Sequence, residues 1–159
     1  MLQEVTIRPI VPGDEAHIRD FFAVMSSESV EFFNRGGENL TRALDFCQKQ
    51  DTHERIYWMA EWDGKMAGMV FLTDLHTTIP WLGIAVREDL KGRSLGKKLM
   101  TFAKDYVLTQ GKGGIQLITN LANTRAQRLY EASGFCKIGV HAEYGEWYYL
   151  LRFSKTQVK

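Results

Sequence analysis

A basic, glycine-containing segment, KGRSLG at residues 91–96, is well suited to bind an anionic ligand. It follows a short apolar run, residues 82–86, that is typical of a buried strand. Apolar residues then recur at helical spacing: Leu95, Leu99, Phe102, Ala103 and Tyr106. The first amides of a helix lack intrahelical partners and carry partial positive charge. With Lys91 and Arg93 nearby, these amides predict a phosphate site.

Two common phosphate-binding motifs do not fit this segment. A Walker loop places four residues between its glycines and continues with Gly-Lys-Ser/Thr. Here three residues separate Gly92 from Gly96, and Lys98 stands where the Ser or Thr would be. The dinucleotide-binding spacing, G-x-G-x-x-G, does not occur in the segment either. Taken alone, the segment fits a phosphate site and an ordinary helix start with solvated lysines equally well.

A second motif, NTRAQRLYEASGF at residues 123–135, decides between these interpretations. It resembles a signature of the GNAT N-acetyltransferase superfamily, Asn-x-x-Ala-x-x-Leu-Tyr-Glu-x-x-Gly-Phe, and matches it at every named position. The segment at residues 91–96 resembles the acyl-CoA pyrophosphate loop of that superfamily, Arg/Gln-x-x-Gly-x-Gly/Ala. Gly96 follows the pattern, whereas Lys91 and Ser94 depart from it. If Ser94 needs a positive φ, strain of about 1–2 kcal/mol is expected there.

The resemblance implies a fold and a co-substrate. The expected fold is α/β, with a central mixed, mostly antiparallel sheet and helices on both faces, in a single N-acetyltransferase domain over residues 1–159. Acetyl-CoA, without a metal, would lie between two central parallel strands that splay apart. The residues expected to contact it are Ile84, Ala85, Val86, Lys91, Gly92, Arg93, Ser94, Leu95, Gly96 and Asn123. Asn123 also fits a helix cap, whatever the function.

Tyr130 resembles the general acid of this superfamily, which assists the departing CoA thiolate. Because a phenol has a pKa of about 10 and a thiol about 8.5, full proton transfer is uphill by roughly 2 kcal/mol. We therefore expect a hydrogen bond from Tyr130 in the transition state. The alternative is a core tyrosine that packs beside Leu129.

The general base is left open by the sequence. An amine nucleophile with a pKa near 10 must lose a proton before attack. Residues 81–86 and 115–119, the two expected central strands, contain no titratable side chain. The remaining candidates are Asp74, His76, Glu31 and a water chain. Several aromatic residues could form the wall of an acceptor site: Phe32, Phe33, Trp81, Tyr144, Trp147 and Tyr148.

Composition narrows the class of protein. The chain has 159 residues, a net charge of +1 and 45% hydrophobic residues, which fits a globular domain and argues against nucleic acid as a partner. Cys47 and Cys136 form no metal-ligand or CxxC pattern, and free thiols are typical of a reducing compartment. We find no signal-peptide pattern and no membrane-spanning apolar run, so we expect a cytoplasmic location and no membrane partner.

The expected element order is β-α-α-β-β-β-α-β-α-β-β. Asp14 and Asn39 are expected helix caps, and residues 26–37 a loop or short helix. Asp63 and Gly64 predict a tight hairpin turn. Residues 142–146, AEYGE, form the turn between the last two strands.

The function we expect is transfer of an acetyl group from acetyl-CoA to a primary amine by direct attack. The acceptor is a small-molecule amine or a protein N-terminus or lysine, and the sequence does not choose between them. A non-catalytic module that senses acyl-CoA or binds a partner is the alternative. Assembly as a homodimer is left open.

Overall fold

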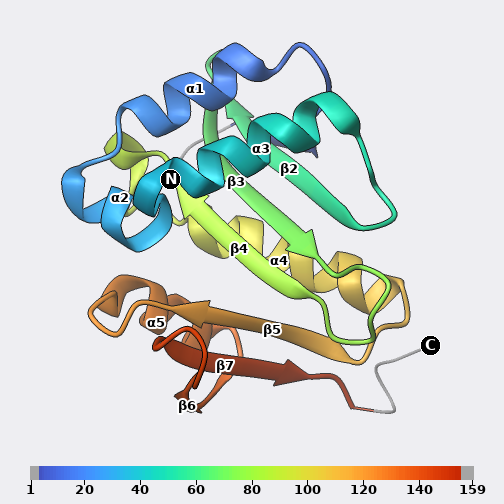
Figure 1. Ribbon diagram of the computed structural model, residues 1–159. Coiled ribbons are helices and arrows are strands. Elements are labelled where there is room, and N and C mark those ends of the chain that lie inside the picture. Colours follow the sequence, from blue (N-terminus) through green and yellow to red (C-terminus); the bar gives the residue numbers. More distant parts are fainter. Residues whose placement is uncertain (1–3, 155–159) are drawn as a thin grey trace.

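The computed structural model describes residues 4–154, which form one seven-stranded sheet with helices packed on it (Figure 1). The strands are β1 (Thr6–Pro9), β2 (Arg55–Trp62), β3 (Lys65–Thr73), β4 (Trp81–Val86), β5 (Gly114–Thr119), β6 (Cys136–Val140) and β7 (Trp147–Arg152). The helices are α1 (Glu15–Ala23), α2 (Ser27–Phe33), α3 (Glu38–Lys49), α4 (Leu95–Thr109) and α5 (Thr124–Ala132), with short 3-10 helices η1 (Arg35–Gly37) and η2 (Glu88–Leu90). The ends of the predicted domain, residues 1–3 and 155–159, lie outside the described residues.

The sheet is mixed and mostly antiparallel, as predicted. Its strand order is β1-β2-β3-β4-β5-β7-β6, and β4 and β5 are the parallel neighbours within the described residues. Parallel neighbours need a crossover, and α4 supplies it between β4 and β5. The start of α4 therefore lies where β4 ends, at the edge where β5 also ends.

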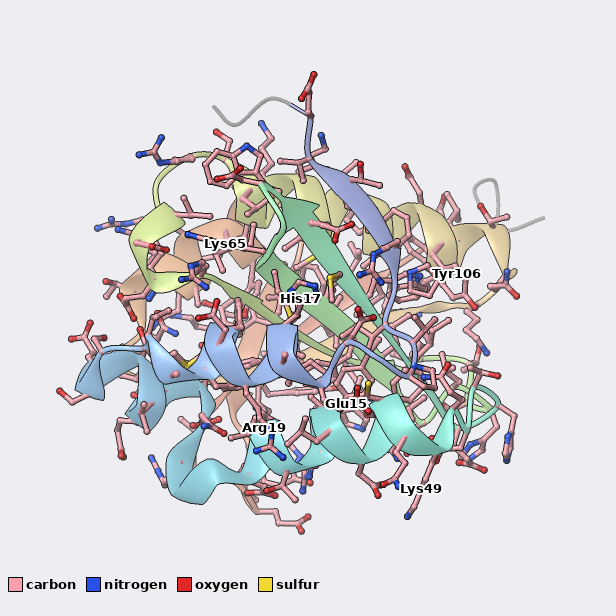
Figure 2. The ribbon with its side chains drawn as sticks, turned by 90° about the horizontal axis from the view of Figure 1, so that it is seen from above. Glu15, His17, Arg19, Lys49, Lys65 and Tyr106 are labelled. Atoms are coloured by element: carbon pink, nitrogen blue, oxygen red, sulfur yellow. The ribbon has the colours of Figure 1, made fainter. Side chains whose placement is uncertain are left out.

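Helices cover both faces of the sheet. In Figure 2, α1 and α3 lie side by side on one face, and α4 lies on the other. Strand β2 shows why both layers form: Tyr57 and Met59 are buried against α1 and α3, whereas Trp58 and Ala60 are buried on the face that α4 covers. A central strand that is apolar on both sides must be covered on both.

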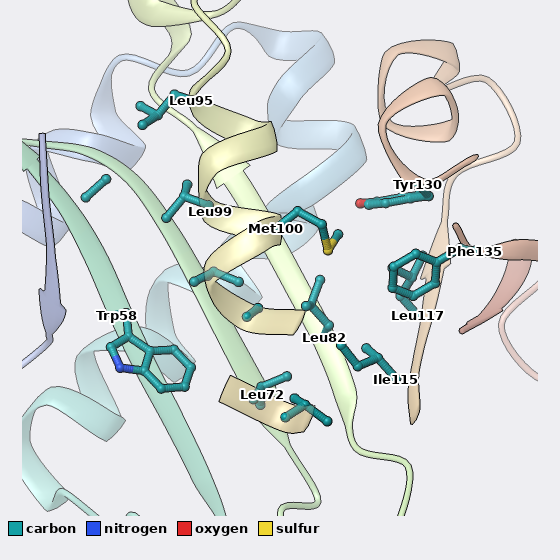
Figure 3. Close-up of a cluster of buried hydrophobic side chains, with 14 of the residues drawn as sticks. Trp58, Leu72, Leu82, Leu95, Leu99, Met100, Ile115, Leu117, Tyr130 and Phe135 are labelled. Carbon is teal, nitrogen blue, oxygen red and sulfur yellow. The ribbon is translucent and has the colours of Figure 1, made fainter. Parts of the chain in front are cut away.

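The core on the α4 side joins the two halves of the sheet (Figure 3). Leu99 and Met100 of α4 are less than 2% exposed and pack in one cluster with Leu82 of β4 and Leu117 of β5. Tyr130 of α5 belongs to the same cluster. Because α4 contacts both strands, side-chain packing beneath β4 and β5 holds them together, in addition to their backbone hydrogen bonds.

Most predicted boundaries are confirmed. The β2–β3 turn has Asp63 and Gly64 at φ 52 and φ 70, the left-handed values that a tight hairpin needs. Asn123 Oδ1 accepts a hydrogen bond from the Ala126 amide and caps α5. Both cysteines are free: Cys47 is buried and Cys136 is exposed.

The connection between α1 and α3 was only partly predicted. Residues 26–37 contain helix α2, capped by Ser26, whose Oγ accepts from the Ser29 amide at 3.1 Å. Asn39 is not the cap of α3, because that helix begins at Glu38 after a left-handed Gly37 with φ 74. Asp14 does precede α1, but its carboxylate pairs with Arg8 at 2.9 Å instead of capping the helix amides.

Gly114, the first residue of β5, lies against β7 with no room for a side chain. A Cβ at this position would lie 2.1 Å from the Leu151 carbonyl oxygen, so Gly114→Ala must push the two strands apart. We expect urea denaturation to show a loss of about 1–3 kcal/mol in the free energy of unfolding. The neighbouring Gly113→Ala is the control: its new methyl meets Thr78 Oγ1 at 3.1 Å, a side-chain atom that can rotate away. It should cost about 0.5 kcal/mol. Equal losses in the two variants would contradict this account.

Candidate active site

Strands β4 and β5 separate soon after they begin. Their ladder in the described residues consists of one pair, Trp81 with Gln116. By contrast, β4 pairs with β3 over its full length, and β5 pairs with β7 over its full length. The edge of β4 that faces β5 therefore carries backbone donors and acceptors with no strand partner from about residue 84 onward.

A cavity of about 830 Å³ occupies this opening. Its walls include all of β4, the start of α4, and the side of α5 that carries Asn123 and Tyr130. The cavity continues past the opening to α2 and to the β6–β7 turn, residues 141–146. A volume of this size is typical of sites for small ligands and cofactors.

The start of α4 forms one end of the cavity. Ser94 precedes the helix with φ 63 and ψ 13, and Gly92 in the same turn has φ 82. Ser94, Leu95, Gly96 and Lys97 line the cavity, so the unpaired first amides of a 15-residue helix lie at its wall. A Cβ on Gly96 would lie 3.3 Å from Leu129, so glycine allows α4 and α5 to approach closely here.

Lys91 ties this end of the cavity to α2. Its Nζ donates to Ser29 Oγ at 2.6 Å and pairs with Glu88 at 3.2 Å, and Glu88 in turn accepts from the Ser26 amide at 2.9 Å. Partial burial opposes ionisation of Glu88, but the hydrogen bonds from Ser29 and Ser26 and the Lys91 charge lower the pKa of Glu88 to about 2. Lys91 thus already has an anionic partner within the protein.

All of the predicted acetyl-CoA contacts except Arg93 line the cavity. Arg93 is exposed and does not contribute to the wall. Lys97 does line the cavity, although it was not among the predicted contacts. The sequence carried a signal for it, since Lys97 lies in the first turn of the predicted helix, where side chains stay close to the helix start.

Tyr130 lies at the cavity wall with a buried ring. The residue is 6% exposed, and its ring packs edge-on against Tyr149 with centroids 5.6 Å apart. Within residues 4–154, no group forms a hydrogen bond with the Tyr130 hydroxyl. Every fully buried side-chain oxygen or nitrogen in these residues does have a partner, so the Tyr130 oxygen is not fully buried. The hydroxyl is therefore reached from the cavity and is free to bind a ligand. Burial, and secondarily the charge of Glu146, raise the pKa of Tyr130, so the phenol stays protonated at neutral pH.

The candidate general bases from the sequence analysis differ in whether they line the cavity. Asp74 and Glu31 line the cavity, but the Glu31 side chain is 57% exposed and pairs with Arg35 at 2.8 Å. His76 does not line it; its Nδ1 lies 3.5 Å from the Glu54 carboxylate, and its side chain is 63% exposed.

Glu146 is a cavity residue that the sequence analysis assigned only to a turn. It lies immediately before β7, whose first residue, Trp147, pairs with Thr119 at the end of β5. Burial raises the pKa of the Glu146 carboxyl, and the Arg35 charge only partly offsets this. The sequence gives only a weak signal for this placement. Predicting it requires the register between β6 and β7 as well as the position of the turn.

The aromatic residues divide into two groups. Phe32, Phe33, Trp81 and Tyr144 line the cavity, as do Tyr57 and Phe71. Trp147 and Tyr148 do not: the Trp147 ring lies 4.2 Å from Lys137 Nζ, and the Tyr148 hydroxyl donates to Gln116 Oε1 at 2.8 Å. Aromatic side chains thus form part of the cavity wall, together with charged side chains such as Glu31, Arg35 and Asp74.

Residues 18–135 match the sequence model of the acetyltransferase (GNAT) family. The match covers most of the chain and includes the start of α4 and the Tyr130 segment. The chain belongs to this family. The GNAT fold is also seen in solved structures. The chain superposes with a TM-score of 0.77 on the PaiA N-acetyltransferase of Thermoplasma acidophilum in complex with coenzyme A, at 15% identity over 95% of this chain and 100% of that one.

A second GNAT structure, the spermidine N-acetyltransferase of Vibrio cholerae in complex with CoA and spermine, has a TM-score of 0.77 at 18% identity. That superposition covers 98% of both chains. Among curated relatives, an uncharacterized N-acetyltransferase of Bacillus subtilis, YhfO, is 27% identical over 138 residues, which is 82% of this chain and 89% of the relative.

A mycothiol acetyltransferase of Beutenbergia cavernae is 39% identical over 62 residues. This match spans 39% of the present chain and 21% of that relative, so it concerns a part of the larger protein. Within residues 4–154, we find no helix of the length and apolarity required to cross a membrane. The same residues contain no cluster of His, Cys, Asp and Glu that could hold a metal ion.

The left-handed conformation of Ser94 leads to a prediction about the free energy of unfolding. The position favours glycine, so Ser94→Gly should relieve about 1–2 kcal/mol of strain. Part of this gain is offset by about 0.4–1 kcal/mol, because glycine increases the entropy of the unfolded chain. We expect a net stabilisation of about 0.5–1 kcal/mol by urea denaturation. Ser133→Gly, at a position with φ −91, should show no such gain. A less stable Ser94→Gly variant would show that the loop is not strained.

Proposed function

We propose that the protein is an acetyl-CoA-dependent N-acetyltransferase that acts on a primary amine. The observation that carries this proposal is the cavity, which joins the free amides of α4, the unpaired edge of β4 and the Tyr130 hydroxyl in one space. The supporting comparison is the family match, together with GNAT-fold structures whose descriptions name CoA as a bound ligand.

The residues fit acetyl-CoA along the whole of this path. The pyrophosphate would be bound by the amides of Leu95, Gly96 and Lys97, with the Lys97 side chain adding positive charge. The amide-containing pantetheine arm would hydrogen-bond the unpaired backbone of β4, much as a neighbouring strand would. The thioester would then lie between β4 and Tyr130, where the hydroxyl can donate a hydrogen bond to the sulfur as negative charge develops.

The reaction we propose is direct attack by the amine on the thioester carbonyl. In this reaction, a C–N bond forms and the C–S bond breaks, so the protein must accept a proton from nitrogen and stabilise the departing thiolate. Of the described cysteines, Cys47 is buried against the Val11 carbonyl, with Sγ donating at 3.1 Å, and Cys136 is exposed on β6. Neither lines the cavity, so neither is placed to carry the acetyl group.

The acceptor would enter from the end of the cavity that aromatic side chains line. Carboxylates also occur there, but Glu31 and Glu38 are paired with Arg35 and Arg42. The aromatic walls suit an amine attached to an apolar group, and the lining carboxylates without an ion pair in the described residues, Glu28, Asp74 and Glu146, can also attract a positively charged amine. The cytoplasmic location and the homodimer stay predictions.

Gly96→Asp tests the position of the pyrophosphate. The variant places a carboxylate at the first turn of α4, beside the site that we assign to the phosphates. Acetyl-CoA affinity measured by calorimetry should fall at least tenfold, or about 1.4 kcal/mol. Because a Cβ here already meets Leu129, thermal unfolding must show that the variant is folded. Unchanged affinity in a folded variant would mean that the phosphates bind elsewhere.

Lys97→Gln and Lys98→Gln test the same assignment through neighbouring lysines. Both are exposed on α4, but Lys97 lines the cavity and Lys98 does not. Lys97→Gln should weaken acetyl-CoA binding more at low salt than at high salt, since screening reduces its attraction for the phosphates. Lys98→Gln should have a smaller effect at every salt concentration. The same loss of affinity in both variants would contradict the assignment, because it would mean that positive charge near α4 acts only in a general way.

Tyr130→Phe separates a transferase from a module that only binds acyl-CoA. The lost hydrogen bond belongs to the transition state, so kcat should fall by about 10²-fold while acetyl-CoA affinity hardly changes. Tyr149→Phe is a matched control, because Tyr149 is also buried but its hydroxyl donates to Glu131 at 2.7 Å, away from the cavity. It should lower stability and leave kcat nearly unchanged. An unaffected kcat in Tyr130→Phe would make Tyr130 a packing residue.

A further inference from the structure

Glu146 differs from the other carboxylates that line the cavity. Glu31 and Glu38 are paired with arginines on the same stretch of chain, and the side chains of both are more than half exposed. Glu28 and Asp74 are exposed. Glu146 is half-buried, and its carboxylate forms no ion pair within the described residues. Of the carboxylates in this cavity, it is the one that combines shielding from solvent with a free basic oxygen.

The β6–β7 turn holds Glu146 in a defined place. The His141 amide donates to the Glu146 carbonyl at 2.7 Å, and the Gly145 amide donates to the His141 carbonyl at 2.8 Å. The turn is also attached to the start of β4, because the Trp81 ring packs against the rings of His141 and Tyr144 with centroids 6.1 and 6.3 Å apart. The side chain therefore extends from a closed turn that is fixed to the same strand as the proposed thioester site.

Glu146 and Tyr130 face the same space. Both line the cavity, Tyr130 from helix α5 and Glu146 from the β6–β7 turn. The Glu146 charge adds to the effect of burial in raising the pKa of the phenol. One group is a carboxylate that can accept a proton, and the other is a phenol that can donate one. A site with an acid and a base placed around one reacting centre is the arrangement that acyl transfer to an amine needs.

We infer that Glu146 is the general base that removes the proton from the acceptor amine, directly or through one water. This inference rests on the proposed function. Glu146 takes a proton from the acceptor ammonium, and the free amine then attacks the thioester carbonyl. As the C–N bond forms and the C–S bond breaks, the sulfur takes the electron pair while Tyr130 donates a hydrogen bond to it, and the proton that nitrogen still has to lose passes to the thiolate through water. The products are the N-acetyl amine and free CoA, and Glu146 releases its proton to solvent.

The surroundings of Glu146 strengthen its carboxylate as a proton acceptor. Burial raises its pKa above the ordinary glutamate value of 4.5, and Arg35 opposes the shift. The other charged or titratable side chains that line its cavity or belong to its turn are Glu28, Glu31, Glu38, Arg42, Tyr57, Asp74, Lys91, Lys97, Arg125, Tyr130, His141, Glu143 and Tyr144. A carboxylate with a raised pKa is a better proton acceptor than a solvated one.

The test compares Glu146→Gln with Glu143→Gln, a change in the same turn at an exposed residue outside the cavity wall. CoA release from acetyl-CoA would be followed from pH 5 to 9 with four primary amines. These are a peptide with a free N-terminus, an N-blocked peptide with one lysine, spermidine and phenethylamine. We expect Glu146→Gln to lose about 10²-fold in kcat/KM at neutral pH, with acetyl-CoA affinity and thermal stability retained. Its rate should recover as rising pH supplies free amine, and the acid limb of the parent profile, with a midpoint above 4.5, should disappear.

Each outcome decides a separate point. If the parent and Glu143→Gln are active and Glu146→Gln keeps both the parent rate and the acid limb, Glu146 is not the base, while the proposed function stands. If Glu146→Gln loses activity to the same extent at every pH, its role is structural and the inference is wrong. If the parent binds acetyl-CoA but acetylates none of the amines, the proposed function itself fails, and the role of Glu146 fails with it.

Discussion

The separation of β4 from β5 after a single residue pair is the constraint on which the candidate site depends. A sheet that stayed paired there would satisfy its own backbone groups and leave no cavity. The opening costs backbone hydrogen bonds, and the structure offsets this cost beneath the sheet, where α4 packs against both strands. Leu99 and Met100 contribute to that packing with almost no exposure to solvent. The hydrophobic core therefore maintains a polar gap above it.

The same topology collects the functional groups at one edge. Because β4 and β5 are parallel, their ends lie together, and the elements that follow them begin there. The start of α4 follows β4, and the start of α5 follows β5. The amides of α4 and the Tyr130 hydroxyl of α5 thus face the same cavity, although they come from different segments of the chain. The β6–β7 turn reaches that space from a third direction, through the register of β7 with β5.

The parts of this arrangement that depend on local patterns could be predicted from the sequence. The Asp63-Gly64 turn, the Asn123 cap and the start of α4 follow from residue types over a few positions. Asn39 is not a cap, and Asp14 occupies the N-cap position of α1 without a side-chain capping bond, because neighbouring groups compete. A left-handed Gly37 starts α3 earlier, and Arg8 takes the Asp14 carboxylate. Glu146 was missed for a different reason: its place depends on pairing between strands far apart in sequence.

The central claim is that the opening between β4 and β5 binds acetyl-CoA with its sulfur beside Tyr130. A crystal structure of the protein grown with CoA tests it most directly. The account predicts pyrophosphate oxygens within hydrogen-bond distance of the Gly96 and Lys97 amides, and the CoA sulfur within hydrogen-bond distance of the Tyr130 hydroxyl. CoA bound outside the opening, or a sulfur directed away from Tyr130, would contradict it.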